Sequence, residues 1–141
     1  MGIYKNYVDP YRASDINKGM KIKQIKNFKM NDQTYSLRRK VINLVYEVKN
    51  SGVNLPRIEV KIGEQRKPNV LGVALLKDNK IWITEDAIKM GEDALRNVVF
   101  HEIVHAVTGF GHDENCPLMC SKLGKLLNKK DCLDKLKQYI N

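Results

Sequence analysis

The stretch Glu92–Gly109, with the sequence EDALRNVVFHEIVHAVTG, decides the fold. Its apolar side chains lie on nearly every side of a helix: Leu95, Val98, Val99, Phe100, Ile103, Val104 and Val107. This pattern predicts a helix from about Glu92 to Gly109, where a glycine can adopt the left-handed conformation that ends a helix. Because so little of its circumference is polar, we expect this helix to be mostly buried.

One polar stripe runs along this apolar helix, formed by Asn97, His101, His105 and Thr108. Within it, His101-Glu102-Ile103-Val104-His105 has the pattern HExxH. Residues four apart project from one helix face, so the two imidazoles can bind a single cation. Zinc accepts neutral imidazole nitrogens, and catalytic zinc sites leave the fourth position to water. Glu102 lies about 100° from His101 around the helix axis, a suitable place for a base that acts on that water.

His112 is a candidate third ligand, because all three histidines of the chain lie within residues 101–112. Gly109 and Gly111 allow the sharp reversal that would bring His112 back to the helix. Asp113, Glu114 and Cys116 are substitute ligands. The alternative to a metal site is a pair of histidines that are merely hydrogen-bonded in a core.

The stretch HEIVHAVTGFGHDENCPLM, residues 101–119, resembles the metzincin class of zinc metallopeptidases, whose HExxHxxGxxH motif is followed by a Met-turn. It is also similar to short zincin-like proteins of tailed phages. The resemblance implies peptide hydrolysis with Zn²⁺ as cofactor. It also implies His101, His105 and His112 as ligands, Glu102 as general base and Met119 as the Met-turn methionine. One difference is that three residues separate His105 from Gly109 where the motif has two, so the turn must absorb one inserted residue.

The rest of the chain predicts an α+β domain, a small zincin-like fold over residues 1–141 with an irregular basic segment at 1–30. The sheet is expected to be mostly antiparallel, with three to four strands backed by a helix, and short helices should follow the long one. Helices are expected near 34–49, 118–127 and 131–140, and strands near 57–62, 70–76 and 81–84. The last two strands should form an antiparallel hairpin.

In zincins an edge strand just before the active-site helix pairs with an extended substrate. The resemblance therefore implies that Ile81, Trp82 and Ile83 bind substrate, although Trp82 alone is better explained as a packing residue. Cys116, Cys120 and Cys132 are an odd number, which predicts reduced thiols rather than a disulfide framework. A second, structural metal site at these cysteines is a weaker alternative.

The net charge of +9 is distributed unevenly along the chain. Residues 1–50 carry eleven Lys/Arg against four Asp/Glu, residues 51–115 eight against ten, and residues 116–141 six against two. The basic ends are either a solvated lysine surface or a patch for an anionic partner such as nucleic acid. No apolar run is long enough to span a membrane, and the start does not resemble a signal peptide, so we expect a cytoplasmic protein, in the host cytoplasm if phage-encoded.

The sequence therefore predicts a zinc metalloendopeptidase with a peptide or protein substrate. Two alternatives remain. One is a non-catalytic zinc-binding protein whose basic ends associate with nucleic acid or a virion. The other is a SprT-like protease that acts on DNA-bound proteins.

Overall fold

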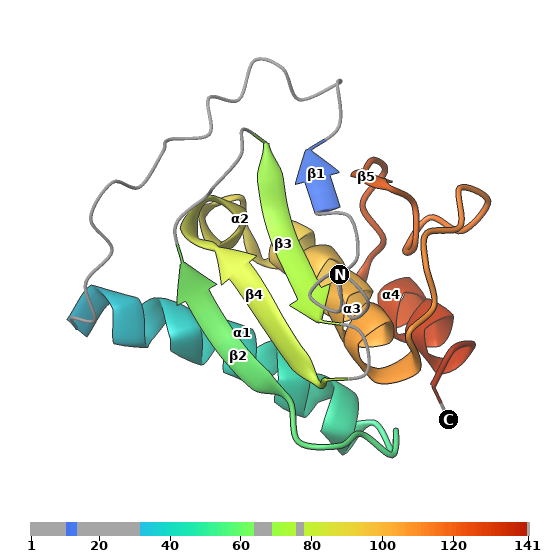
Figure 1. Cartoon of the computed structure of the whole chain (residues 1–141), viewed down its shortest axis with the longest axis horizontal. Helices are drawn as coiled ribbons and strands as arrows, with labels where there is room; N and C mark the ends of the chain where they lie inside the picture. Colours follow the sequence, from blue (N-terminus) through green and yellow to red (C-terminus); the bar gives the residue numbers. More distant parts are fainter. Residues whose placement is uncertain (1–10, 14–31, 64–68, 76–77, 141) are drawn as a thin grey trace, which may run out of the picture.

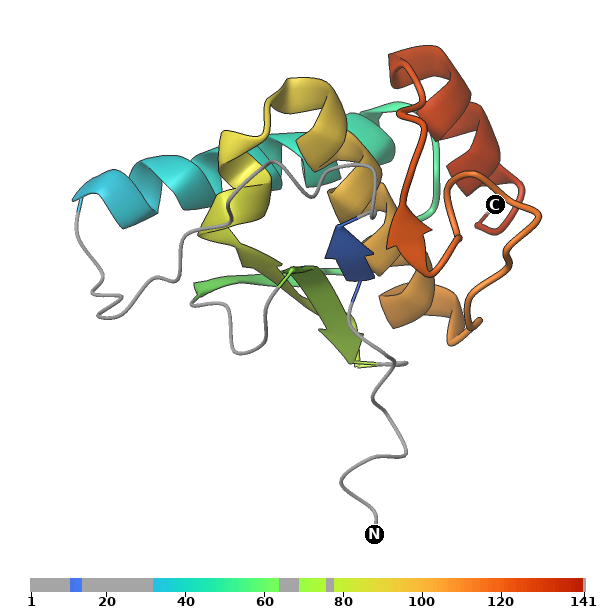
Figure 2. The ribbon, with the colours of Figure 1, turned by 90° about the horizontal axis from the view of Figure 1, so that it is seen from above.

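The structure is a computed structural model that describes residues 11–13, 32–63, 69–75 and 78–140. It is an α+β domain, as predicted, in which a mixed sheet has α1 and α3 packed on one face (Figures 1 and 2). The elements, in chain order, are β1 (Tyr11–Ala13), α1 (Asp32–Asn50), β2 (Glu59–Gly63), β3 (Val70–Leu75), β4 (Lys80–Thr84), α2 (Glu85–Lys89), α3 (Glu92–Thr108), β5 (Lys122–Leu123) and α4 (Lys129–Lys137).

The apolar periodicity of α1 and of the central strands builds the core. The predicted α1 stripe is buried along its length: Leu37, Val41, Leu44, Val45 and Val48. On β4, Ile81 and Ile83 are fully buried, while Trp82 points to the other face of the sheet and is partly exposed. The indole of Trp82 lies against Gly63 of β2, where a side chain would collide with it. This contact gives Trp82 a packing role.

The strand order is β2-β4-β3-β1-β5. The hairpin of β3 and β4 is antiparallel, as predicted, and β1 is antiparallel to β3. However, β2 and β4 pair in parallel, as do β1 and β5. The sheet is therefore mixed rather than mostly antiparallel. Within the described residues it has five strands instead of three or four, because the short strands β1 and β5 extend it beyond β3.

The expectation that Ile81, Trp82 and Ile83 form an edge strand that pairs with an extended substrate is wrong. β4 lies inside the sheet and is hydrogen-bonded to β2 on one side and β3 on the other, so its main chain has no edge to offer a peptide. The side chains of Ile81 and Ile83 are fully buried in the core.

The ends of the chain depart from the prediction in two further ways. The expected helix at 118–127 does not form; this segment contains β5 instead, and the following helix is α4, with Asn128 as its N-cap. Within the N-terminal segment, which was expected to be irregular, Tyr11–Ala13 form a strand between β3 and β5. The remaining residues of 1–30, including its lysines, lie outside the described residues. Among the helices of the described part, none has the length and apolar character needed to cross a membrane.

Candidate metal centre

The helix that carries the HExxH pattern is buried almost throughout, as its composition predicts. Every residue from Ala94 to Ala106 is buried. Gly109 ends the helix with a φ of 77°, in the left-handed region, and its N–H donates to the carbonyl of His105. The helix is therefore a rigid element of the core that fixes the positions of His101, Glu102 and His105.

The three histidines come together at the end of this helix. His101, His105 and His112 each offer one ring nitrogen, and these nitrogens lie within 4.8 Å of one another. The ring centroids are 4.6 Å apart for His101 and His105 and 4.8 Å apart for His105 and His112. The chain turns at Gly109, which has a left-handed φ, whereas Gly111 adopts no left-handed conformation. The prediction that His112 returns to the helix face is confirmed.

Backbone carbonyls fix the orientation of the two helical imidazoles. Nδ1 of His101 is 2.6 Å from the carbonyl oxygen of Leu118, and Nδ1 of His105 is 2.6 Å from that of Phe110. A carbonyl oxygen can only accept a hydrogen bond, so in both rings the proton is on Nδ1. Each Nε2 is then an acceptor with a free lone pair.

These two acceptors face each other, since Nε2 of His101 and Nε2 of His105 are 3.0 Å apart. Two lone pairs at that distance repel unless a cation lies between them. Two nitrogen ligands of a tetrahedral zinc ion, each about 2.0 Å from the metal, would be about 3.3 Å apart. The described residues therefore fit a divalent ion held by three imidazoles, and the carbonyls of Leu118 and Phe110 orient two of its ligands.

Burial keeps the helical histidines neutral. It lowers the pKa of His101 well below its usual value, and the nearby His105 lowers it further. Burial also lowers the pKa of His105 to about 4, against the opposing effect of the Phe110 carbonyl. Neutral imidazole is the form that binds a metal, so both rings are ready to act as ligands at neutral pH.

Glu102 lies one residue beyond the first ligand and is fully buried. Neither of its carboxyl oxygens has a hydrogen-bond partner among the described residues. Burial raises the pKa of Glu102 well above its usual value. The carboxyl group fits beside β3 because residue 72 is a glycine; a Cβ there would be 2.7 Å from Oε2 of Glu102. A cation at the histidines would supply the positive charge that this carboxyl lacks and would lower its pKa.

The segment that the resemblance identifies as a Met-turn lies beside His101. Leu118 provides the carbonyl that accepts from His101, and Met119 is fully buried. The N–H of Asp113 donates to the carbonyl of Met119 at 2.8 Å, which ties this turn to the loop that carries His112. Met119 is therefore buried in the turn that follows His112, and its role as a Met-turn methionine stays a prediction.

The substitute ligands are not part of the cluster. Asp113 and Glu114 are exposed, and their carboxyl groups accept the backbone N–H groups of Asn115 and Ser121. Cys116 is buried but lies outside the group of ligand atoms. All three cysteines are free thiols, as predicted, and the described residues hold no second cluster of metal ligands built on them.

Sequence reasoning gave no role to Tyr11, which forms a wall of the centre. Its ring stacks on His101 with a centroid distance of 3.6 Å and an interplanar angle of 6°. Tyr11 is 1% exposed, and its hydroxyl has no hydrogen-bond partner among the described residues. No local pattern could have identified it, because 90 positions of the chain separate the two rings.

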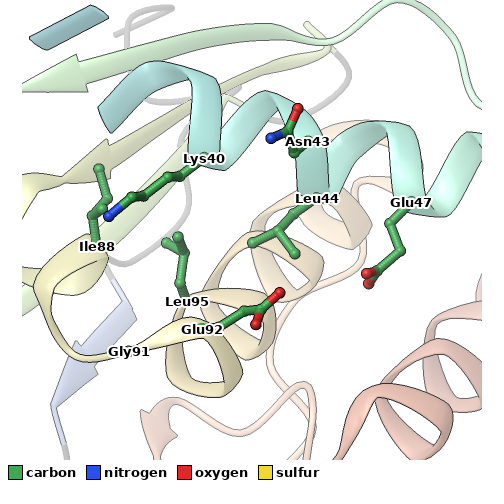
Figure 3. Close-up of a pocket in the computed structure, with 8 residues that line it drawn as sticks. All are labelled: Lys40, Asn43, Leu44, Glu47, Ile88, Gly91, Glu92 and Leu95. Carbon is green, nitrogen blue, oxygen red and sulfur yellow. The ribbon is translucent and has the colours of Figure 1, made fainter. Parts of the chain in front are cut away.

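A hollow of about 340 Å³ lies elsewhere, between α1 and the start of α3 (Figure 3). It is lined by Lys40, Asn43, Leu44, Glu47, Ile88, Gly91, Glu92 and Leu95, and it contains none of the three histidines.

Comparisons of the chain with protein-family models, with curated proteins and with solved structures give no match. The histidine cluster is therefore the feature of the described residues that bears on function.

Proposed function

We propose that this protein is a zinc-dependent metallopeptidase. The observation that carries the proposal is the convergence of the Nε2 lone pairs of His101 and His105, 3.0 Å apart, with His112 beside them and the unpaired carboxyl group of Glu102 next along the helix. Three imidazole ligands and a buried carboxyl group are the donor set of a catalytic zinc site with one position left for water.

Zinc bound to the three imidazoles would polarise a peptide carbonyl and acidify a water molecule in its remaining position. The carboxyl of Glu102 would accept a proton from the attacking water and deliver it to the nitrogen of the leaving amine. Burial raises the pKa of Glu102 in the absence of a metal, and bound zinc would lower it, so that the carboxylate is ionised and can accept the proton.

Metal analysis combined with peptide cleavage tests this function. We expect wild type to bind one zinc ion and His105→Ala to lose zinc affinity by at least a hundredfold. Glu102→Gln should keep its zinc, while hydrolysis of a peptide library falls between about a hundredfold and ten-thousandfold. The matched control is Glu114→Gln, which changes an exposed glutamate outside the cluster and should keep both zinc and activity. Unchanged cleavage by Glu102→Gln would contradict the proposal.

One observation favours a second candidate, a zinc site that is structural. Among the described residues of the centre, His101, Glu102 and His105 are fully buried, whereas His112 is partly exposed. Such a protein would bind zinc, lose thermal stability when the metal is chelated, and cleave no peptide. Binding to nucleic acid through the basic ends would accompany this function and should weaken steeply with salt.

A further inference from the structure

The stacking of Tyr11 on His101 has an unusual geometry for two neutral rings. Atoms in contact are about 3.5 Å apart, so a centroid distance of 3.6 Å at an angle of 6° leaves almost no lateral offset between the rings. Neutral aromatic rings avoid such a face-to-face arrangement, because their electron-rich faces repel, and prefer offset or edge-to-face contacts.

A cation on His101 changes the sign of this interaction. A metal bound at Nε2 withdraws electron density from the imidazole and gives the ring positive character. The electron-rich face of a phenol attracts positive charge, and the attraction is stronger when the pair is desolvated. His101 is fully buried and Tyr11 is 1% exposed, so water does not weaken the contact.

The hydrogen bond of His101 to the Leu118 carbonyl does not by itself fix the tilt of the imidazole ring. The Leu118 carbonyl restrains Nδ1 of His101, but a single hydrogen bond leaves the ring free to rock about that point. A flat ring against its face removes this freedom and keeps Nε2 directed at the position it shares with His105.

We propose that Tyr11 is a positioning residue of the metal centre, whose ring stacks on the metal-bound form of His101 and raises the affinity of the site for zinc. This inference rests on the proposed function for the identity of the ion. It assigns part of the metal centre to β1, a strand of three residues that lies between β3 and β5 (Figure 1). By reciprocity, metal binding stabilises the docking of β1 to the same extent.

Metal titration of three full-length variants tests this role. Zinc affinity is measured by competition with a chromophoric chelator, and the site geometry by the visible absorption of the Co²⁺-loaded protein. We expect Tyr11→Leu to weaken zinc binding about tenfold, in the range found when groups that orient ligands are removed. Tyr11→Phe keeps the aromatic face and should stay within about threefold of wild type. The Co²⁺ spectrum should change for Tyr11→Leu and not for Tyr11→Phe.

A control separates positioning from loss of stability. Val41→Ala removes a fully buried side chain of α1 and should lower the melting temperature without changing zinc affinity or the Co²⁺ spectrum of the folded protein. If Tyr11→Leu does not fold, the comparison of Tyr11→Phe with wild type still decides, because a tenfold loss in Tyr11→Phe would assign the effect to the hydroxyl and overturn the stacking role.

The outcomes distinguish this inference from the proposed function. If wild type binds zinc and Tyr11→Leu binds it equally well, the positioning role is wrong while the metal centre stands. If Tyr11→Leu keeps its affinity and cleaves peptides faster than wild type, β1 covers the site instead of completing it, and the inference is overturned. If wild type binds no zinc, the proposed function fails first.

Discussion

The two ends of α3 bury polar side chains in opposite ways. Near its start, Arg96 is 4% exposed and bonds to three carboxylates: Glu47 at 2.7 and 3.2 Å, Asp93 at 3.0 Å and Glu92 at 3.3 Å. Near its end, two acceptor nitrogens of His101 and His105 face each other, and the carboxyl of Glu102 has no partner in the described part of the chain.

This difference separates a cluster that pairs its charges within the chain from a group of histidines that could bind a metal ion. Buried polar groups are costly unless they are paired, and the Arg96 cluster pairs them within the chain. At the histidine end, Nε2 of His101 and Nε2 of His105 face each other as acceptors, and neither carboxyl oxygen of Glu102 has a hydrogen-bond partner among the described residues. A cation is the partner that satisfies such a set.

The largest effect on this comparison should come from Arg96→Met. Removing the guanidinium leaves Glu47, which is only 18% exposed, with Lys129 at 3.5 Å as a remaining cation. We expect the free energy of unfolding to fall by about 3 kcal/mol, measured by urea denaturation. Zinc affinity of the folded protein should not change. The double variant Arg96→Met/Glu47→Leu should recover most of the loss, and a joint loss of zinc affinity would show that the two clusters are not independent.

The metal-free histidine end should make stability depend on pH. Because the pKa of His105 is about 4 in the folded protein and about 6.5 when unfolded, the unfolded chain alone takes up a proton between these values. The free energy of unfolding should therefore decrease as pH falls from about 6.5 to 4, by up to about 1.4 kcal/mol per pH unit for each such histidine. His101 acts in the same direction.

Glu102 opposes this trend, because its raised pKa makes the folded protein lose stability as pH rises. The measurement is therefore made by urea denaturation in the Glu102→Gln background with a chelator present. Adding His105→Gln to that background should reduce the slope, and an equal slope in both would contradict the lowered pKa of His105.

The smallest effect should come from Gly72→Ala. Its Cβ would lie 2.7 Å from Oε2 and 3.0 Å from Cγ of Glu102, a buried side chain with little room to move. We expect a loss of about 1 kcal/mol of stability and a clear fall in peptide cleavage, with zinc affinity unchanged. Gly111→Ala is the matched control, because a Cβ there meets nothing within 4 Å. Equal activity of the two variants would mean that Glu102 need not occupy its present position.

Local features of the chain were predictable from the sequence. The spacing of His101 and His105, the burial of their helix and its end at Gly109 all follow from patterns within one helix. The return of His112 also followed, because the turn lies next to that helix. The short helix α2 was missed; it depends on Thr84, whose hydroxyl accepts the Ala87 N–H and donates to the Leu71 carbonyl.

Contacts between distant segments could not be predicted in this way. Nothing near Ile81 in the sequence reveals that β4 lies between β2 and β3, because strand order is decided by pairing across the whole sheet. Tyr11 and the partners of Arg96 depend on the same kind of contact. The leucines of the segment 118–127 favour a helix in the sequence pattern. In the structure, Leu118 is buried as part of a turn and Leu123 as part of the short strand β5.

Main-chain oxygens fix the tautomers of the two helical imidazoles. The groups at Phe110 and Leu118 that accept from these rings are present in every amino acid. Substitutions of Phe110 or Leu118 would therefore leave the tautomers of His101 and His105 unchanged, provided that the loop keeps its backbone conformation. The length and path of the loop between α3 and Leu118 therefore constrain the ligand geometry more than the side chains at positions 110 and 118 do.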